Sequence, residues 1–465
     1  MISVLRGVAR AMCMDRIIWW LLGASFIVWP FWGFEVGHVG TFGISPTILL
    51  GSLAMVLWVL HTSVGNGGFE LHRAAGWTVV LMLCATLAAF SIVRDGASSI
   101  DKPVRTLAHL AFLIGMMVVW ASMKRPPHAL LQLFRTWIWL AFALCLFGVY
   151  QIFARLYHLP FAWLELTNVT LLQWYRGDET QQLSLRFGNY FRATSVFSEP
   201  STLGLFCAQA ILMLGTATAA HHGDVYVRSG FMRAVIGITL MVTLFLTYSM
   251  GALLTASTLF VMMTLSLERA RRLIVLRNAL AGIAIFVVVD LSLLQPIFGL
   301  SITQLTAARV QGIIAARSSG DYRDYVVGDS FATRLRSLRE GERIWEQYPI
   351  IGAGLGRYAE LSTYTAYNDT LYFRVLAELG LLGLIAVVGF LWSVSVHLFR
   401  ATRRLAIGSD EWIVVRTMAY TVVIQFVIGW ASDLLHAELF WIEMGMALLA
   451  LKAVAGDRRA IVRIT

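Results

Sequence analysis

Long uninterrupted runs of apolar residues constrain this chain more than any other feature of its sequence. Several runs reach about 18 to 20 residues, which is the length of helix that crosses a lipid bilayer. Charged residues make up only 14% of the 465 residues, whereas a soluble domain carries about 25%. Because lipid offers no partner to an unpaired backbone group, the embedded segments must be helical. The sequence therefore predicts an all-α polytopic membrane protein, with residues 1–465 forming one integral membrane domain.

About twelve segments are apolar and long enough to be membrane spans. They cover residues 17–34, 44–62, 75–93, 104–121, 129–154, 200–219, 234–249, 250–267, 278–294, 371–396, 412–431 and 434–451. The least distinct boundary divides 234–249 from 250–267, at Tyr248-Ser249-Met250-Gly251. Two connections, 155–199 and 295–370, are much longer than the others, and connections of that length are usually functional.

The basic residues are distributed unevenly among the connections. A net charge of +10 would suggest a nucleic-acid partner in a soluble protein, but a membrane protein keeps its excess Lys and Arg on the cytoplasmic side. We therefore expect no nucleic-acid partner. With the N-terminus inside, the cytoplasmic stretches hold Arg6, Arg10, Arg16, Arg73, Lys124, Arg125, Arg228, Arg233, Arg269, Arg271, Arg272, Arg277, Arg400, Arg403, Arg404, Arg416, Lys452, Arg458, Arg459 and Arg463. This asymmetry predicts that both termini are cytoplasmic and that 155–199 and 295–370 lie on the opposite side.

The connection 295–370 contains an arginine-rich amphipathic helix pattern that begins at Asp329 or Ser330, either of which is a plausible N-cap. Four apolar residues share one face of this helix: Phe331, Leu335, Leu338 and Trp345. Arg336, Arg339 and Arg343 lie on the opposite face. They fit a solvated face or a contact with lipid headgroups, and Arg339 is also a candidate phosphate contact. Arg334 projects near the apolar edge, where it needs an anionic partner: either a substrate phosphate, or a carboxylate such as Glu340 or Glu342.

The other long connection ends at the outer mouth of an expected span. Pro200 suits the first turn of a helix, and Glu199 directly precedes it. A carboxylate at such a mouth is costly to bury and is therefore a candidate functional group. The alternative is a helix cap, in which the N-terminal end of the helix favours the negative charge. Arg192 lies at the same mouth.

A third candidate pair opens the expected span 371–396. Arg374 and Glu378 are four residues apart, so they share one face near the outer end of the helix. They are either a pair that neutralises itself or groups that face a substrate. Asn368 lies one to two turns before Arg374 and is a candidate substrate contact.

The sequence contains no convincing metal or nucleotide site. Gly352-x-Gly354-x-Gly356 follows Pro349 and no strand, so it predicts a tight turn and not a dinucleotide loop. The last outer turn contains Asp433, His436, Glu438 and Glu443 without recognisable ligand spacing, which favours a polar turn. The four cysteines have no CxxC spacing. We expect neither a metal nor a cofactor.

Several of these motifs, in this order, resemble the O-antigen polymerase and ligase superfamily of bacterial envelope glycosyltransferases. The matching stretches are Arg192-Ala-Thr-Ser-Val-Phe-Ser-Glu-Pro200, Tyr248-Ser249-Met250-Gly251, Ser330-x-x-x-Arg334, Pro349-Ile-Ile-Gly-Ala-Gly-Leu-Gly356, Asn368-x-x-Leu371 and Glu378-Leu379-Gly380. The likeness covers roughly residues 192–390. Two positions depart from the family pattern: Met250 stands where an arginine is frequent, and Tyr367 stands where ligases tend to have histidine.

The resemblance implies a GT-C-like fold in the bacterial inner membrane, with 155–199 and 295–370 as periplasmic loops. It implies a polymerase that transfers an undecaprenyl-pyrophosphate-linked oligosaccharide onto an acceptor sugar at the periplasmic face, without a metal. Under this hypothesis Glu199 is the first candidate for the base and Glu378 the second. The pyrophosphate would be bound by Arg192, Arg334, Arg339, Asn368 and Arg374, because fixed guanidinium groups stabilise the charge that grows on a leaving phosphate.

Two other functions stay open. A ligase would move finished polysaccharide onto a lipid or protein acceptor, and the absence of the histidine at Tyr367 counts against it. A transporter or flippase would favour repeated halves and interrupted helices, and no repeated halves are visible. The bilayer is an expected partner, and a chain-length regulator is left open as a protein partner.

Overall fold

The computed structural model describes most of the chain. The described residues are 2–40, 42–64, 69–94, 101–170, 182, 186–187, 190–220, 222–265, 272–273, 276, 280, 283–284, 286–288, 290–299, 301–304, 307, 311, 330–363, 370–430, 432–454 and 461–464. Every structural statement below concerns these residues.

Helices make up nearly all of the described chain. They are α1 (Ile2–Val28), α2 (Pro46–Val64), α3 (Gly76–Arg94), α4 (Asp101–Ser122), α5 (Pro127–Tyr157), α7 (Pro200–Ala219), α8 (Gly230–Leu246), α9 (Met250–Leu265), α11 (Gln295–Phe298), α13 (Ser330–Gln347), α14 (Tyr358–Leu361), α15 (Leu371–Thr402), α16 (Asp410–Ile428) and α17 (Glu438–Val454). Short strands form three antiparallel pairs: β1 (Gly37–Val39) with β2 (Phe42–Ile44), β3 (Phe69–His72) with β6 (Ile461–Ile464), and β4 (Arg186–Phe187) with β5 (Tyr190–Phe191).

The helices follow the apolar runs of the sequence. The expected division at residues 248–251 is confirmed, since α8 ends at Leu246 and α9 begins at Met250. Among the described residues, six helices are long and apolar enough to cross a membrane: Pro46–Ser63, Lys102–Ser122, Pro127–Tyr157, Pro200–Ala219, Leu371–Thr402 and Asp410–Ile428. The segment 278–294 is described only in part, and twelve spans stay a prediction.

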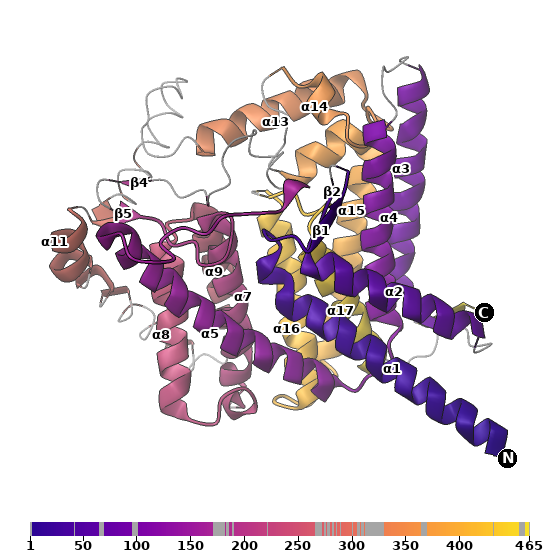
Figure 1. Cartoon of the computed structure of the whole chain (residues 1–465), viewed down its shortest axis with the longest axis horizontal. Helices are drawn as coiled ribbons and strands as arrows, with labels where there is room; N and C mark the ends of the chain where they lie inside the picture. The colour runs from indigo at the N-terminus through magenta and orange to yellow at the C-terminus, as the bar shows by residue number, and fades with distance from the viewer. Residues whose placement is uncertain are drawn as a thin grey trace. The chain divides into compact units, whose positions relative to one another are not determined.

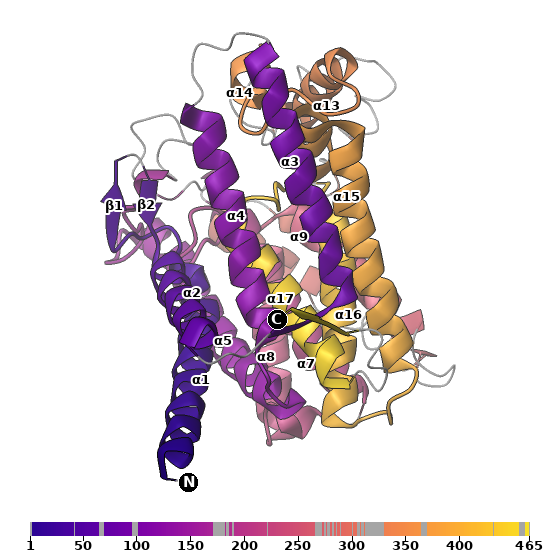
Figure 2. The same ribbon diagram turned by 90° about the vertical axis from the view of Figure 1, so that its right-hand side faces the viewer.

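The chain divides into two compact units. The first contains Met1–Thr136, Asn168–Tyr175 and Ser337–Thr465, and the second contains Trp137–Thr167 and Arg176–Arg336. In the first unit α3 packs beside α15, and α4 packs beside α17, as Figures 1 and 2 show. Its core contains large side chains that are fully buried, including Trp120, Phe390 and Trp441.

The second unit is built around α7. This helix packs against α8 and α9, and the rings of Trp137 on α5 and Phe206 on α7 have centroids 4.7 Å apart. The approach of α7 to α9 is close, because a Cβ at Gly204 would lie 2.6 Å from the Cβ of Ala252.

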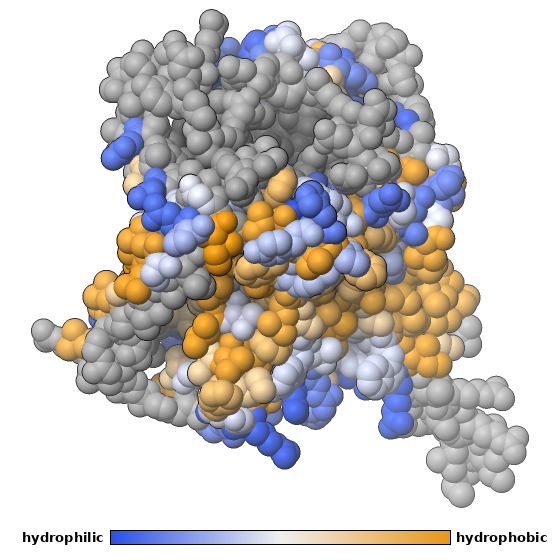
Figure 3. Space-filling model, turned by 60° about the vertical axis from the view of Figure 1, so that its left-hand side comes forward, coloured by the Kyte–Doolittle hydropathy of each residue, from blue (hydrophilic) through white to orange (hydrophobic). Residues whose placement is uncertain are grey.

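Large apolar side chains also lie on the outside of the molecule (Figure 3). Along α2 alone, Leu49, Leu53, Val56, Val59 and Leu60 are each between 45% and 56% exposed. Apolar surface of this extent is unstable in water, whereas a helix that satisfies its own backbone groups can present it to lipid. The chain is therefore an integral membrane protein.

The arginine-rich helix is present, and its described part buries residues outside the expected apolar face. The helix α13 begins at Ser330, as predicted. Within residues 337–347, the part of α13 whose side chains are described, Ser337, Gly341 and Ile344 are buried, whereas Leu338 and Trp345 of the expected face are only half-buried. The reason is that Ile344 packs into a small core with Ala353, Tyr358 and Ala377.

Candidate functional site

The helix α15 is broken after its first nine residues. Gly380 has φ 66° and ψ −166°, a backbone conformation that is not helical. A span over residues 371–396 was expected from the sequence, and the break within it was not. A break of this kind leaves backbone groups without their helical partners, and inside a membrane protein those groups need substitutes.

The loop before α14 supplies the donors that the break requires. In a regular helix the carbonyls of Ala377 and Glu378 would accept from the chain four residues ahead. Here they accept from the backbone N–H groups of Ala353 and Gly354, each at 2.9 Å. The two carbonyls are therefore satisfied by a different segment of the chain.

The same loop also supplies the acceptors. The N–H groups of Leu381 and Leu382 would bond those two carbonyls in an unbroken helix. They donate instead to the carbonyls of Pro349, at 2.9 Å, and Ile350, at 3.2 Å. Two helical hydrogen bonds have thus been exchanged for four bonds to the inserted loop, which fixes the loop against the first turns of α15.

The contact between the loop and the break in α15 requires glycine in both segments, at Gly352 and at Gly380. A Cβ at Gly352, where φ is +75°, would lie 2.4 Å from the carbonyl carbon and oxygen of Glu378. The loop is held from a third side, because the Ser91 hydroxyl of α3 donates to the Gly352 carbonyl at 2.8 Å. The expected tight turn is therefore a loop inserted into a broken membrane helix.

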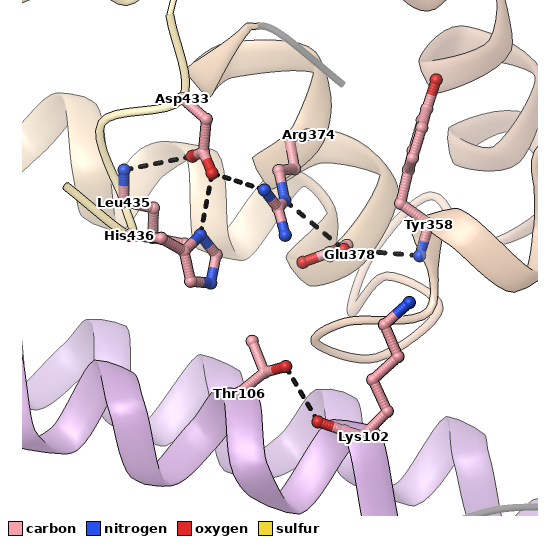
Figure 4. A network of polar contacts seen from close by, with 8 residues as sticks. All are labelled: Lys102, Thr106, Tyr358, Arg374, Glu378, Asp433, Leu435 and His436. Carbon is pink, nitrogen blue, oxygen red and sulfur yellow. Dashed lines mark hydrogen bonds and ion pairs between the residues drawn. The ribbon is translucent and has the colours of Figure 1, made fainter. Parts of the chain in front are cut away.

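A buried network of charged groups lies beside the break (Figure 4). Arg374 Nη1 donates to Asp433 Oδ2, and Arg374 Nε lies 3.5 Å from Glu378 Oε1. The side chain of Arg374 is 13% exposed, and those of Glu378 and Asp433 are each 1% exposed. One arginine is therefore held between two carboxylates with almost no water, which strengthens both attractions.

Asp433 also bonds its own turn. Its Oδ2 lies 2.9 Å from His436 Nδ1, and its Oδ1 accepts from the backbone N–H of Leu435 at 3.2 Å. Burial alone would raise the pKa of Asp433, but Arg374 and His436 outweigh it and lower the pKa to about 2. The ring of His436 in turn stacks on His109 of α4, with centroids 6.1 Å apart.

Glu378 is placed differently from Asp433. Its Oε1 accepts from the backbone N–H of Tyr358, at 3.3 Å, and faces Arg374. Its Oε2 is buried and has no hydrogen-bond partner among the described residues. An unsatisfied carboxylate oxygen is costly, so this atom is a candidate acceptor for a substrate hydroxyl.

Comparison with known proteins identifies the family of this region. Residues 235–388 match the family model described as O-antigen ligase. The chain carries a domain of the O-antigen polymerase and ligase superfamily. No protein of curated function matches the chain.

Members of this superfamily are glycosyltransferase-like enzymes that act on lipid-linked polysaccharide. The match begins in α8 and ends in α15, so it includes the inserted loop, the break at Gly380 and both Arg374 and Glu378. It does not extend to Arg192, Glu199 or Asp433.

The first superfamily motif, residues 192–200, lies in the second unit. Arg192 is half-buried, and its Nε donates to the Thr247 carbonyl at 2.7 Å. Glu199 is the N-cap residue of α7, with Pro200 at the start of the helix as expected, but its carboxylate makes no capping hydrogen bond. Thr202 Oγ1 lies 3.5 Å from Glu199 Oε1. Glu199 is therefore only weakly held.

Arg155, which sequence reasoning did not single out, holds this motif in place. Its Nη1 donates to the carbonyl of Arg192 at 2.7 Å, and its Nη2 donates to Thr194 Oγ1 at 2.6 Å and to Gln182 Oε1 at 3.1 Å. The guanidinium also lies over the ring of Trp163, 4.1 Å from its centroid. The available indication was an arginine directly after the expected span 129–154, at the edge of the membrane segment.

For the remaining predicted site residues the structure shows little of the side-chain surroundings. Arg334 lies in α13, where its side chain is not described, and Asn368 lies outside the described residues. Arg339 is exposed. Arg343, from the same arginine face, bonds Glu340 Oε2 at 2.9 Å. Glu340, which was weighed as a partner of Arg334, is therefore paired with a different arginine.

The four residues weighed as a metal cluster do not converge in the described structure. Asp433 and His436 bond each other. Glu438 accepts from the Ser45 hydroxyl at 3.1 Å, and Glu443 bonds Gln425. His109 was not predicted as part of the network, although a histidine within an apolar segment is the type of residue that marks such sites.

Proposed function

We propose that the protein polymerises a bacterial surface polysaccharide or exopolysaccharide in the inner membrane. The donor would be a glycan on undecaprenyl pyrophosphate, and the acceptor the terminal sugar of another lipid-linked repeat unit. Both termini would lie in the cytoplasm and the active site would face the periplasm. The observation that carries this proposal is the buried Glu378 carboxylate, with one oxygen unsatisfied, beside the break in α15 and within the matched family region.

The reaction needs one base and a stabilised leaving group. An acceptor hydroxyl attacks the anomeric carbon, the bond from this carbon to the pyrophosphate oxygen breaks, and the pyrophosphate keeps the electron pair. Glu378 Oε2 would take the hydroxyl proton, because it has no partner of its own. Glu199 stays the alternative base, because its carboxylate is half-buried and makes no capping hydrogen bond in the described structure.

The arginines would stabilise the departing pyrophosphate. Arg192 is half-buried at a helix mouth, and Arg334 and Arg339 belong to α13. One such contact is typically worth about 3 kcal/mol of barrier. Arg374 already has two carboxylates as partners. Its first proposed role is therefore to position Glu378. Its second is to contact the phosphate of a substrate that displaces Glu378 from it.

Two alternative functions have specific support. The description of the matching family supports a ligase, which would transfer finished polysaccharide to a lipid or protein acceptor. The break in α15 supports a transporter, because interrupted helices line transport sites in many carriers.

A reaction of purified protein with a short undecaprenyl-pyrophosphate oligosaccharide tests the three functions. A ladder of longer lipid-linked products, formed without metal or a second protein, supports the polymerase. Transfer only to an added acceptor that is not a repeat unit supports the ligase. No transfer to any acceptor, together with movement of the lipid-linked donor across a proteoliposome membrane, supports the transporter.

A further inference from the structure

A groove lies between α1 and the start of α5 in the first unit. It has a volume of about 380 Å³ and is lined by Arg16, Trp19 and Trp20 from α1, and by Arg125 and His128 from the chain that enters α5. It lies outside the candidate site, and the proposed function gives it no role.

The two arginines of this groove have no carboxylate partner among the described residues. Arg125 Nη2 donates to the backbone carbonyl of Asp15 at 2.8 Å, and its Nε is buried without a partner. The Asp15 carboxylate lies instead 3.3 Å from His61 Nε2. Arg16 is exposed. The first turn of α5 contains no acidic residue, so no carboxylate in the described part of the chain pairs with the guanidinium groups of the groove.

Tryptophan borders this charge. Trp20 is 73% exposed, and Ile17 beside it is 43% exposed. Trp19 packs edge-on against Trp120, with centroids 5.6 Å apart, and the Arg125 guanidinium lies 5.6 Å from the Trp19 ring centroid. Exposed tryptophan is enriched at the depth where lipid headgroups meet acyl chains. A ligand in this groove would therefore contact the guanidinium groups and the exposed apolar side chains at the same time.

We propose that this groove binds the headgroup phosphate of an anionic phospholipid. The phosphate would be bound by Arg16 and Arg125, and the adjoining glycerol and acyl chains would pack on Trp20. Basic pockets between membrane helices are suited to such headgroups, and Arg16 and Arg125 belong to stretches expected on the cytoplasmic side, where anionic lipid is abundant. A soluble anion would use the charge but not the exposed tryptophan.

Native mass spectrometry of the purified full-length protein tests this proposal. Delipidated protein is titrated with phosphatidylglycerol or phosphatidylcholine, and the bound lipid is measured for wild type, Arg16→Gln, and the double variant Arg16→Gln with Arg125→Gln. Arg403→Gln, an exposed arginine on another expected cytoplasmic stretch, is the matched control. We expect wild type and Arg403→Gln to retain phosphatidylglycerol selectively, and the double variant to bind it at least about tenfold more weakly, because charge-assisted hydrogen bonds are lost.

Arg16→Gln removes no side-chain hydrogen bond or ion pair among the described residues, so its effect separates lipid binding from folding. A weaker affinity for phosphatidylglycerol in this variant, with an unchanged melting temperature in detergent alone, supports the site. Equal binding of the two lipids by wild type, or unchanged binding by the double variant, overturns the proposal. Stabilisation by inorganic phosphate that equals stabilisation by phosphatidylglycerol at the same concentration identifies a free-anion site and also overturns it.

Discussion

Gly380 and the carbonyl oxygen of Ile350 approach so closely that a Cβ on residue 380 would lie 2.3 Å from that oxygen. The contact joins the two halves of the site region: the break in α15 and the loop that fills it. Two segments that are 30 residues apart in sequence thereby complete each other's hydrogen bonds. The position of the Glu378 carboxylate depends on this contact.

We predict that Gly380→Ala destabilises the protein by about 3 kcal/mol or more, because alanine disfavours a φ of 66° with this ψ and its methyl group would also clash with the loop. The measurement is the thermal unfolding midpoint of purified protein in detergent. Gly237→Ala in α8 is the control, since the nearest atom to its Cβ is 4.0 Å away and alanine is favoured in a helix. Equal midpoints for wild type and Gly380→Ala would contradict the structure of the break.

Arg155→Ala should cost about 3 kcal/mol of stability, because it removes donors to the carbonyls of Ala162 and Arg192 and one of the donors to Gln182 Oε1. Arg155→Lys should recover only part of the loss, because an ammonium cannot reproduce the planar arrangement of donors. Arg135→Ala, an exposed arginine earlier in α5, should change stability by less than about 0.5 kcal/mol. The unfolding midpoints of the three variants measure these losses of stability. Equal midpoints for Arg155→Ala and Arg135→Ala would contradict the prediction.

Acid should weaken the network around Asp433 in a defined pH range. The pKa of Asp433 is lowered from 3.8 to about 2 in the folded protein, so its ionised form stabilises the fold above pH 4. That contribution, on the order of 2 kcal/mol, is lost as the pH falls from 4 towards 2. The stability difference between wild type and Asp433→Asn should therefore shrink over this interval, as measured by unfolding midpoints. Asp410→Asn, an exposed aspartate in α16, is the control, and a difference that stays constant from pH 5 to pH 2 would refute the assignment.

Arg192→Ala and Arg334→Ala should each shorten or abolish the polysaccharide made in cells, because each removes a proposed contact to the leaving pyrophosphate. The measurement is the chain-length distribution on a gel, with the membrane level of each variant confirmed by immunoblot. Arg228→Ala, an exposed arginine on an expected cytoplasmic stretch, should leave the distribution unchanged. Normal chain length in both test variants at normal protein level would remove the arginines from the mechanism.

The sequence predicts the positions of the six described helices that are long and apolar enough to cross a membrane, because hydrophobic runs of bilayer length leave the backbone little choice. It also places Arg374 and Glu378 on one face, since residues four apart in a helix always are. The break at Gly380 was missed. Glycine occurs in many membrane helices, and nothing local shows that a distant loop will replace the lost hydrogen bonds.

The partners of the site were missed for a related reason. Asp433 reaches Arg374 across 59 residues of sequence, and only the packing of the helices brings the two together. Helical periodicity also left out Ile344 of α13, because the residues that bury it, Ala353, Tyr358 and Ala377, come from segments that follow the helix in sequence.

The central claim, that Glu378 serves glycosyl transfer, is tested most directly by Glu378→Gln in the purified reaction. Glutamine keeps the shape of the side chain but cannot take the proton of the acceptor hydroxyl. With a lipid-pyrophosphate-linked oligosaccharide as substrate, we predict a product ladder from wild type and a loss of at least about 100-fold in rate for Glu378→Gln, with the unfolding midpoint showing that the variant is folded. A folded Glu378→Gln protein that elongates the substrate at the wild-type rate would contradict the account.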